Sequence, residues 1–186
     1  RQKVNYHLRA LESHGLVRVA EQRKWGGLTE RLAEGVLEGV ARVEGAVGCP
    51  CRVHETDPSV LKDCDALIIG SPNWSGMTGK LKEWFDYSGD LWESGDLAGK
   101  PGGVFTAGWS RSGGIEATLS QLLHLLLSHG LLVVGLPWTR RMRMSGSYYG
   151  ATAHGDVTED DLEQARVLGE RVARTAAELG RGHHEQ

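Results

Sequence analysis

Cysteine and long apolar runs are scarce in this sequence, and each shortage excludes a class of protein. Three cysteines (Cys49, Cys51 and Cys64) are too few for the disulfide framework of a small secreted domain, so we expect the cytoplasm as the location. The most apolar stretch, residues 122–136, is interrupted by histidine and serine and falls short of the roughly 20 apolar residues of a membrane helix. The sequence therefore predicts a protein without a membrane span.

Metal ligands and a leader segment are also poorly represented. Cys49-Pro50-Cys51 offers two soft ligands, but no second ligand pair follows at the spacing of a zinc site, and free thiols are the alternative reading. We predict no metal centre. The chain opens with Arg1-Gln2-Lys3, without Met and without an apolar signal segment, so an N-terminal portion is expected to be missing.

Glycine and tryptophan, by contrast, are abundant. The chain has 26 glycines in 186 residues, and six tryptophans against two phenylalanines. Four of these tryptophans stand within three residues of a glycine in polar, loop-like sequence: Trp25, Trp74, Trp92 and Trp109. Glycine permits close approach of the backbone to a ligand, and an indole stacks on flat rings. This combination indicates loops that bind a flat ligand.

The apolar pattern predicts an α/β fold with a doubly wound parallel sheet. Short continuous apolar runs, typical of strands buried on both faces, occupy residues 66–70, 103–106 and 131–136. Segments of helical periodicity alternate with them, at 29–43, around 81–85, at 115–129 and at 159–179. A short strand is also expected at 51–54, and residues 139–157 form an excursion rich in Gly, Tyr and Arg.

Three loops are expected at the carboxyl edge of this sheet, where ligands of such folds bind. Lys24 to Glu30 runs into a helix start that could receive a phosphate, although a plain turn is the alternative. Ser71 to Gly76 carries Trp74, which could stack on a heterocycle or simply cover the end of the sheet. Thr106 to Gly114 offers backbone amides, hydroxyls and the positive Arg111, in a composition that a solvated loop also explains.

These loops and the segments after them resemble a known family. Ser71-Pro72-Asn73-Trp74-Ser75-Gly76 with Gly79 to Asp86 resembles the second FMN loop and following helix of flavodoxin-like proteins. The further order of Gly89 to Lys100, Val104-Phe105-Thr106, Ser128-His129-Gly130 and Tyr149 to Thr152 is similar to NAD(P)H:quinone oxidoreductases of the tryptophan-repressor-binding-protein type. The resemblance covers about residues 26–180. It implies a flavodoxin-like sheet of order 2-1-3-4-5 with helices on both faces, FMN as cofactor, and a homo-oligomer (dimer or tetramer).

The resemblance also assigns site residues. It implies that FMN is bound by a phosphate loop, a ring-stacking loop, a third loop and one flavin-proximal histidine, namely by Gly26, Gly27, Leu28, Thr29, Pro72, Asn73, Trp74, Ser75, Gly76, Thr106, Ala107, Gly108, Trp109, Ser110, Arg111, Ser112 and His129. Trp92 is implied to wall the nicotinamide and quinone site. Without the resemblance, His129 before Gly130 reads as an ordinary helix C-terminal residue favoured by the helix dipole.

The N-terminal segment differs in charge from the rest of the chain. Residues 1–31 carry seven Lys and Arg against three Asp and Glu, whereas residues 32–186 carry fourteen against twenty-one. Arg1 to Glu12 with Gly15-Leu16-Val17 resembles the recognition helix of an arsenical-resistance-repressor-type (ArsR) winged helix, with 16–32 as its wing. That resemblance implies major-groove contacts from the basic and amide side chains Arg1, Gln2, Lys3, Tyr6 and His7. We expect a partial winged helix at 1–27 and a flavodoxin-like domain at 26–186, with DNA binding only in a longer chain.

The resemblance to the quinone oxidoreductases implies an FMN-dependent enzyme that transfers electrons from NAD(P)H to a quinone or similar small acceptor. No side-chain nucleophile is expected, because Ser110 lacks both a nucleophile elbow and an identifiable base. Two alternatives remain. One is a DNA-binding regulator whose flavodoxin-like body senses redox state or flavin, and the other is an electron carrier without a substrate site.

Overall fold

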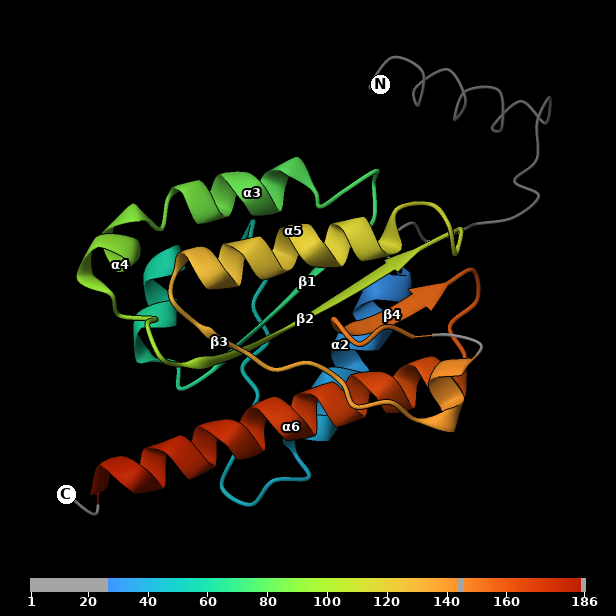
Figure 1. Cartoon of the computed structure of the whole chain (residues 1–186). Coiled ribbons are helices and arrows are strands. Elements are labelled where there is room, and N and C mark those ends of the chain that lie inside the picture. The colour runs from blue at the N-terminus through green and yellow to red at the C-terminus, as the bar shows by residue number, and fades with distance from the viewer. Residues whose placement is uncertain (1–26, 144–145, 185–186) are drawn as a thin grey trace, which may run out of the picture.

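Parallel strands form the centre of the structure, and helices cover both of their faces (Figure 1). The computed structural model describes residues 27–143 and 146–184. Within them the sheet consists of β1 (Leu67–Pro72), β2 (Pro101–Gly108), β3 (Leu132–Val133) and β4 (Ala151–His154). β2 is central, with all eight of its residues buried. The predicted doubly wound parallel fold is confirmed.

β3 and β4 share one position in the sheet. β1 pairs with β2 along one side, from Leu67 opposite Gly102 onward. On the other side, β3 pairs with the first two residues of β2, and β4 pairs with the last four, from Phe105 opposite Ala151 onward. The chain thus leaves the sheet after β3 and returns to the same row as β4. Every pairing between these strands is parallel, so all the strands run in one direction, and β1, β2 and β4 end at one edge.

The helices form two layers. One face of the sheet carries α3 (Gly79–Asp86), α4 (Gly89–Ser94) and α5 (Ile115–Ser128), and the other carries α2 (Gly27–Val40) and α6 (Glu159–His184). Two short 3-10 helices complete the described elements, η1 (Pro58–Asp63) and η2 (Arg140–Arg143). Because strand side chains alternate between faces, Val104 packs with the first layer, and Phe105 and Ala107 pack with the second.

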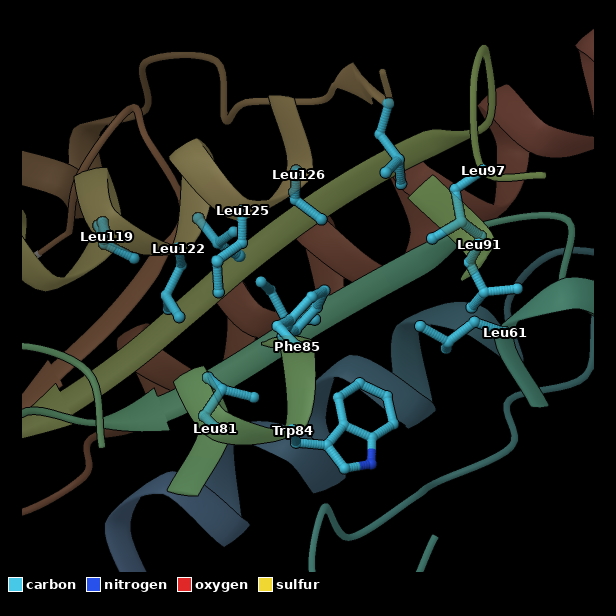
Figure 2. Packing of buried hydrophobic residues seen from close by; sticks show 13 residues of the cluster. Leu61, Leu81, Trp84, Phe85, Leu91, Leu97, Leu119, Leu122, Leu125 and Leu126 are labelled. Carbon is cyan, nitrogen blue, oxygen red and sulfur yellow. The ribbon is translucent and has the colours of Figure 1, made fainter. Parts of the chain in front are cut away.

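Leucines and two aromatic rings form the core under α3 and α5. Figure 2 shows the leucines of α5 directed toward Phe85 and the sheet, among them Leu119, Leu122 and Leu126, which are fully buried. The rings of Trp84 and Phe85 meet edge to face, with centroids 5.3 Å apart. Each such leucine contributes roughly 2 kcal/mol to folding by leaving water, so α5 is the best-anchored helix of this face.

Small residues let α2 and α6 pack backbone against backbone. A Cβ atom at Gly39 would lie 1.9 Å from the carbonyl oxygen of Arg166, and one at Gly169 would lie 2.1 Å from the carbonyl oxygen of Val36. Real Cβ atoms do not approach backbone this closely, so neither position can carry a side chain unless the helices separate. Gly35 repeats the pattern against Ala165, at 3.0 Å.

Ion pairs cross the outer surface of the same two helices. Arg166 Nε donates to Glu38 Oε2 at 2.6 Å, and Arg42 Nη2 donates to Glu163 Oε2 at 3.1 Å. The hydrogen bond from Arg42 lowers the pKa of Glu163 below its ordinary value. This stabilisation is therefore present above the ordinary carboxyl pKa and is lost as the pH falls through the lowered one. Partly exposed pairs of this kind contribute less than about 1 kcal/mol each, so they add only modestly to the packing of α2 against α6.

Several predicted elements need correction. The expected strand at 51–54 is wrong, because this segment is a loop in which only Val53 packs against the core. The strand expected at 131–136 shrinks to β3, because the backbone N–H of Leu136 donates to the carbonyl oxygen of Tyr148 at 3.0 Å and no longer to β2. The excursion predicted at 139–157 contains β4, whose small residues gave no apolar run.

The remaining long elements agree with the sequence. The patterns at 29–43, 66–70, 103–106, 115–129 and 159–179 correspond to α2, β1, β2, α5 and α6, with ends shifted by a few residues. The partial winged helix expected at 1–27 lies outside the described residues, except for Gly27. Residues 27–32, expected as the end of its wing, form the start of α2. In the part of the chain that is described, no helix combines the length and apolarity needed to cross a membrane.

Candidate functional site

The carboxyl edge of the sheet brings together the predicted ligand loops. β1 ends at Pro72, β2 at Gly108 and β4 at His154, and α2 begins nearby at Gly27 (Figure 1). The loop 73–78 follows β1, and the loop 109–114 follows β2 and leads into α5. Because adjacent parallel strands carry these two loops, the loops are neighbours. The expected position of a ligand in this fold is therefore present.

Asn73 joins the two loops. Its backbone N–H donates to the carbonyl oxygen of Ala107 at 2.8 Å, and its side-chain Nδ2 donates to the carbonyl oxygen of Gly113 at 2.7 Å. Its Oδ1 accepts from the backbone N–H of Gly76 at 3.2 Å and from Thr118 Oγ1 at 2.9 Å. The amide of Asn73 thus fixes the shape of both loops, so we assign it a positioning role.

The loop after β1 is tightly turned and further anchored. Ser75 has φ +59° and Gly76 has φ +132°, a backbone region that favours glycine. Ser71 Oγ accepts from the backbone N–H of Thr78 at 3.0 Å, and Gln121 Oε1 accepts from that of Met77 at 2.8 Å. These contacts hold the loop against β1 and α5, so a ligand would meet a preformed surface.

Each loop presents an indole at its surface. Trp74 is 61% exposed and Trp109 is 55% exposed, although large aromatic side chains are usually buried. They come from different strands but from the same edge of the sheet. Large apolar rings beside anchored backbone amides fit a flat heterocycle that needs both stacking and hydrogen bonds. This donor set fits the isoalloxazine ring of FMN.

The predicted phosphate loop is only partly within the described residues. Gly26 lies outside them, and Gly27, Leu28 and Thr29 form the first turn of α2 rather than a loop. The first N–H groups of a helix have no partner within the helix, and the helix dipole favours an anion there. The start of α2 therefore retains the unpaired N–H groups and the helix dipole for which this segment was predicted to bind a phosphate.

Cysteine chemistry does not contribute to this edge. Cys64 lies before β1, where burial raises the pKa of its thiol and its Sγ donates to the carbonyl oxygen of Leu61 at 3.0 Å. Cys49 and Cys51 are exposed and unpaired by disulfide in the loop after α2. Within 27–143 and 146–184, no group of three or more His, Cys, Asp or Glu side chains is arranged to hold a metal ion.

His129 and Trp92 lie at the opposite edge of the sheet from these loops. α5 starts at the carboxyl edge and runs antiparallel to the strands, so His129 at its end lies beside the start of β2. There His129 Nε2 lies 2.9 Å from Ser88 Oγ, and its Nδ1 lies 3.0 Å from the carbonyl oxygen of Leu125. Trp92 belongs to α4 at the same end and is 59% exposed. Within one chain, therefore, neither His129 nor Trp92 lies near the loops 73–78 and 109–114.

Comparison with known proteins identifies the family. A family model described as NADPH-dependent FMN reductase matches residues 59–141. A protein named NAD(P)H dehydrogenase (quinone) from Archaeoglobus fulgidus is 39% identical over 82% of this chain and 93% of its own length. A protein of the same name from Solidesulfovibrio magneticus is 35% identical over 79% of this chain and 91% of its own. The chain belongs to this NAD(P)H dehydrogenase (quinone) family.

Solved structures agree with this membership. The flavodoxin, WrbA-like protein from Agrobacterium tumefaciens is 30% identical, covers 83% of this chain and 93% of its own, and superposes with a TM-score of 0.63. An archaeal flavodoxin at 18% identity and a TM-score of 0.64 shows the shared fold alone. The predicted resemblance to the quinone dehydrogenase family is thus confirmed.

The DNA-binding residues predicted for the alternative function cannot be placed in this fold. Arg1, Gln2, Lys3, Tyr6 and His7 all lie outside the described residues. Sequence reasoning also missed polar residues that the structure brings to the carboxyl edge, chiefly Thr152 and His154 of β4. The only available signal was their position two residues apart, which places them on one face of a strand.

Proposed function

We propose that this member of the NAD(P)H dehydrogenase (quinone) family is an FMN-dependent oxidoreductase that passes electrons from NAD(P)H to a quinone. The observation that carries the proposal is the pair of tryptophan-bearing loops that Asn73 locks together at the carboxyl edge. The relatives' names and the match to the FMN reductase family support the same activity. The predicted cytoplasmic location remains part of this proposal.

The chain's own residues bind and orient the cofactor. FMN, when bound, supplies the two-electron chemistry that no protein side chain provides. Residues 73–76 and 107–112 would hold the ring of FMN with backbone groups, and Trp74 and Trp109 would shield the ring from water. The first turn of α2 would receive its phosphate. No side-chain nucleophile takes part in the proposed reaction, and we assign no catalytic role to the exposed Ser110.

The predicted roles of His129 and Trp92 require a second copy of the chain. β2 spans eight residues, so the two edges of the sheet are separated by about 23 Å, further than any side chain reaches. The amino edge of one copy would have to meet the loops of another. Exposed apolar side chains at that end are suited to such an interface, among them Trp92 at 59% and Tyr87 at 74% exposure. We therefore propose a homo-oligomer with composite sites.

A spectroscopic assay tests the activity. The purified protein, supplied with FMN, is expected to bind it and to lose the yellow flavin absorbance when NADPH is added without oxygen. Addition of 1,4-benzoquinone should restore the absorbance and sustain NADPH consumption. Failure to bind FMN would refute the enzyme proposal. A bound flavin that NADPH does not bleach would instead favour the electron carrier or the sensor.

Mixing two inactive variants tests the composite site. Asn73→Ala damages the loops, whereas the double variant Trp92→Ala, His129→Ala damages only the opposite edge. In a mixed two-fold dimer, one site combines intact loops with an intact opposite edge. Coexpression should therefore restore about a quarter of the wild-type activity. Mixtures no more active than the separate variants would show that the site does not use a second copy.

A further inference from the structure

We propose that a second pocket at the carboxyl edge binds a phosphate group of a nucleotide ligand; this rests on the proposed function. The pocket measures about 480 Å³. It lies between the loop 109–114 with the start of α5 on one side, and η2 with β4 on the other. This volume is within the range of ligand sites. We call it the arginine pocket, after Arg111 and Arg143 in its wall.

The charges that line the arginine pocket favour an anion. Arg111 and Arg143 come from opposite walls, and within 27–143 and 146–184 neither forms an ion pair. Their neighbour Arg141, by contrast, is paired with Asp160 at 3.1 Å. His154 adds a ring nitrogen, and Glu116 is the one acidic lining residue. Two guanidinium groups that line one pocket without carboxylate partners are typical of phosphate recognition.

A threonine in the wall offers its hydroxyl to the pocket. Thr152 is only 5% exposed, and its hydroxyl makes no hydrogen bond to any other residue that the structure describes. Ala151 and Ala153 on either side of it pack into the core toward α6, so Thr152 projects from the opposite face of β4, toward the pocket. Its hydroxyl is not enclosed in the core, so it can form a hydrogen bond with an oxygen of a ligand bound in the pocket.

A second hydroxyl in the wall is half satisfied. Ser147 is 3% exposed and lines the same pocket. Its Oγ accepts from the backbone N–H of Tyr149 at 3.2 Å. Its proton makes no hydrogen bond to another described residue and is available to an acceptor in the pocket. Both hydroxyls can thus donate to one ligand.

The start of α5 strengthens the site. Its N-cap is Gly114, which has no side chain to accept from the first N–H groups of the helix. Those groups, in Ile115, Glu116 and Ala117, belong to the pocket wall. They add backbone donors and the positive end of the helix dipole to the guanidinium and hydroxyl groups. The combined donor set matches a phosphate with its several acceptor oxygens.

The position of the pocket restricts the source of the phosphate. The loop 109–114 forms both its wall and one side of the proposed flavin site. The first turn of α2 already accounts for the single phosphate of FMN in the proposed function, and no residue of α2 lines the arginine pocket. The phosphate in this pocket therefore belongs to NAD(P)H bound beside the flavin.

Calorimetric titration with inorganic phosphate and with adenosine 2′,5′-bisphosphate tests the pocket. Arg111→Gln, Arg143→Gln and Thr152→Val should each weaken binding of at least one probe about tenfold, because each removes a donor to a charged group. Arg140→Gln is the matched control, since Arg140 is an exposed arginine of η2 outside the pocket wall. Thermal melting of each variant verifies that it folds. Equal affinities of the control and all three variants would overturn the proposal.

Two further measurements identify the source. Arg143→Gln, which lies outside the flavin loops, should raise the KM for NADPH about tenfold and leave the affinity for FMN unchanged. If Arg143→Gln instead weakens the binding of FMN and spares riboflavin, which has no phosphate, the assignment to NAD(P)H is overturned. The probe titrations need neither flavin nor turnover. A protein that binds the phosphate probes but shows no reductase activity would refute the proposed function and support the phosphate site. A protein that is an active reductase but does not bind the probes would refute the phosphate site alone.

Discussion

Replacement of Gly169 by alanine is expected to lower the melting temperature by about 5–10 °C, although it adds only one carbon. The new Cβ would lie 2.1 Å from the carbonyl oxygen of Val36, so α2 and α6 would have to separate. Alanine is the better helix former by about 1 kcal/mol, and this gain opposes the loss. A net decrease would therefore show that the backbone contact outweighs helix propensity. Thermal denaturation followed by circular dichroism measures it.

Gly180 provides the matched control on the same helix. A Cβ atom there meets nothing within 4 Å, so Gly180→Ala changes helix propensity without a clash. We expect this variant to be as stable as the wild type or slightly more stable. If Gly169→Ala were also neutral, the close approach of α2 and α6 would not be a constraint on the fold.

Replacement of Asn73 by alanine is expected to weaken FMN binding about 30- to 100-fold. The change removes the donor to Gly113 and the acceptor for Gly76 and Thr118, so the two flavin loops lose their common anchor. Loss of two or three such hydrogen bonds at about 1 kcal/mol each accounts for the expected factor. Titration of the protein into FMN, followed by flavin fluorescence, measures the dissociation constant.

Asn73→Asp separates the two functions of this side chain. The carboxylate keeps the acceptor for Gly76 and Thr118 but cannot donate to the carbonyl oxygen of Gly113. We expect an affinity between those of the wild type and the alanine variant. An alanine variant that binds FMN as tightly as the wild type would show that the loops keep their shape without Asn73.

Continuous apolar runs made the centre of the fold predictable. The runs at 66–70 and 103–106 correspond to β1 and β2, because strands buried on both faces must be apolar throughout. β4 was missed for the converse reason. Its sequence, Ala151-Thr152-Ala153-His154, has neither bulk nor alternation, and pairing with β2 rather than its own composition makes it a strand.

The candidate site was predictable in its loops but not in its contacts. Glycine and polar residues directly after buried strands identified residues 73–76 and 107–112, and the structure places them together at one edge. Nothing in the sequence indicates that Asn73 anchors both loops, because its partners Gly113 and Thr118 are 40 and 45 residues away. Nor does it reveal a pocket whose walls come from β4 and η2.

The position of His129 could have been anticipated from topology. A helix that follows a strand in a parallel sheet runs back to the amino edge, so the end of α5 lies far from the loop that precedes the helix. The resemblance matched His129 with a flavin-proximal residue of the family. It did not indicate whether that histidine belongs to the same copy of the chain as the flavin loops or to another copy.

The divided edge strand has a consequence for how this protein can vary. β3 and β4 are each held by hydrogen bonds to β2, so the register of the sheet is set on both sides of residues 134–150. Residues 137–141, within the intervening segment, are exposed and can therefore change in length and charge without shifting either strand. On this side of β2, the paired segments are only two and four residues long, which gives another chain little strand to extend. The same interruption thus leaves room for variation and shortens the edge at which the sheet could misassemble.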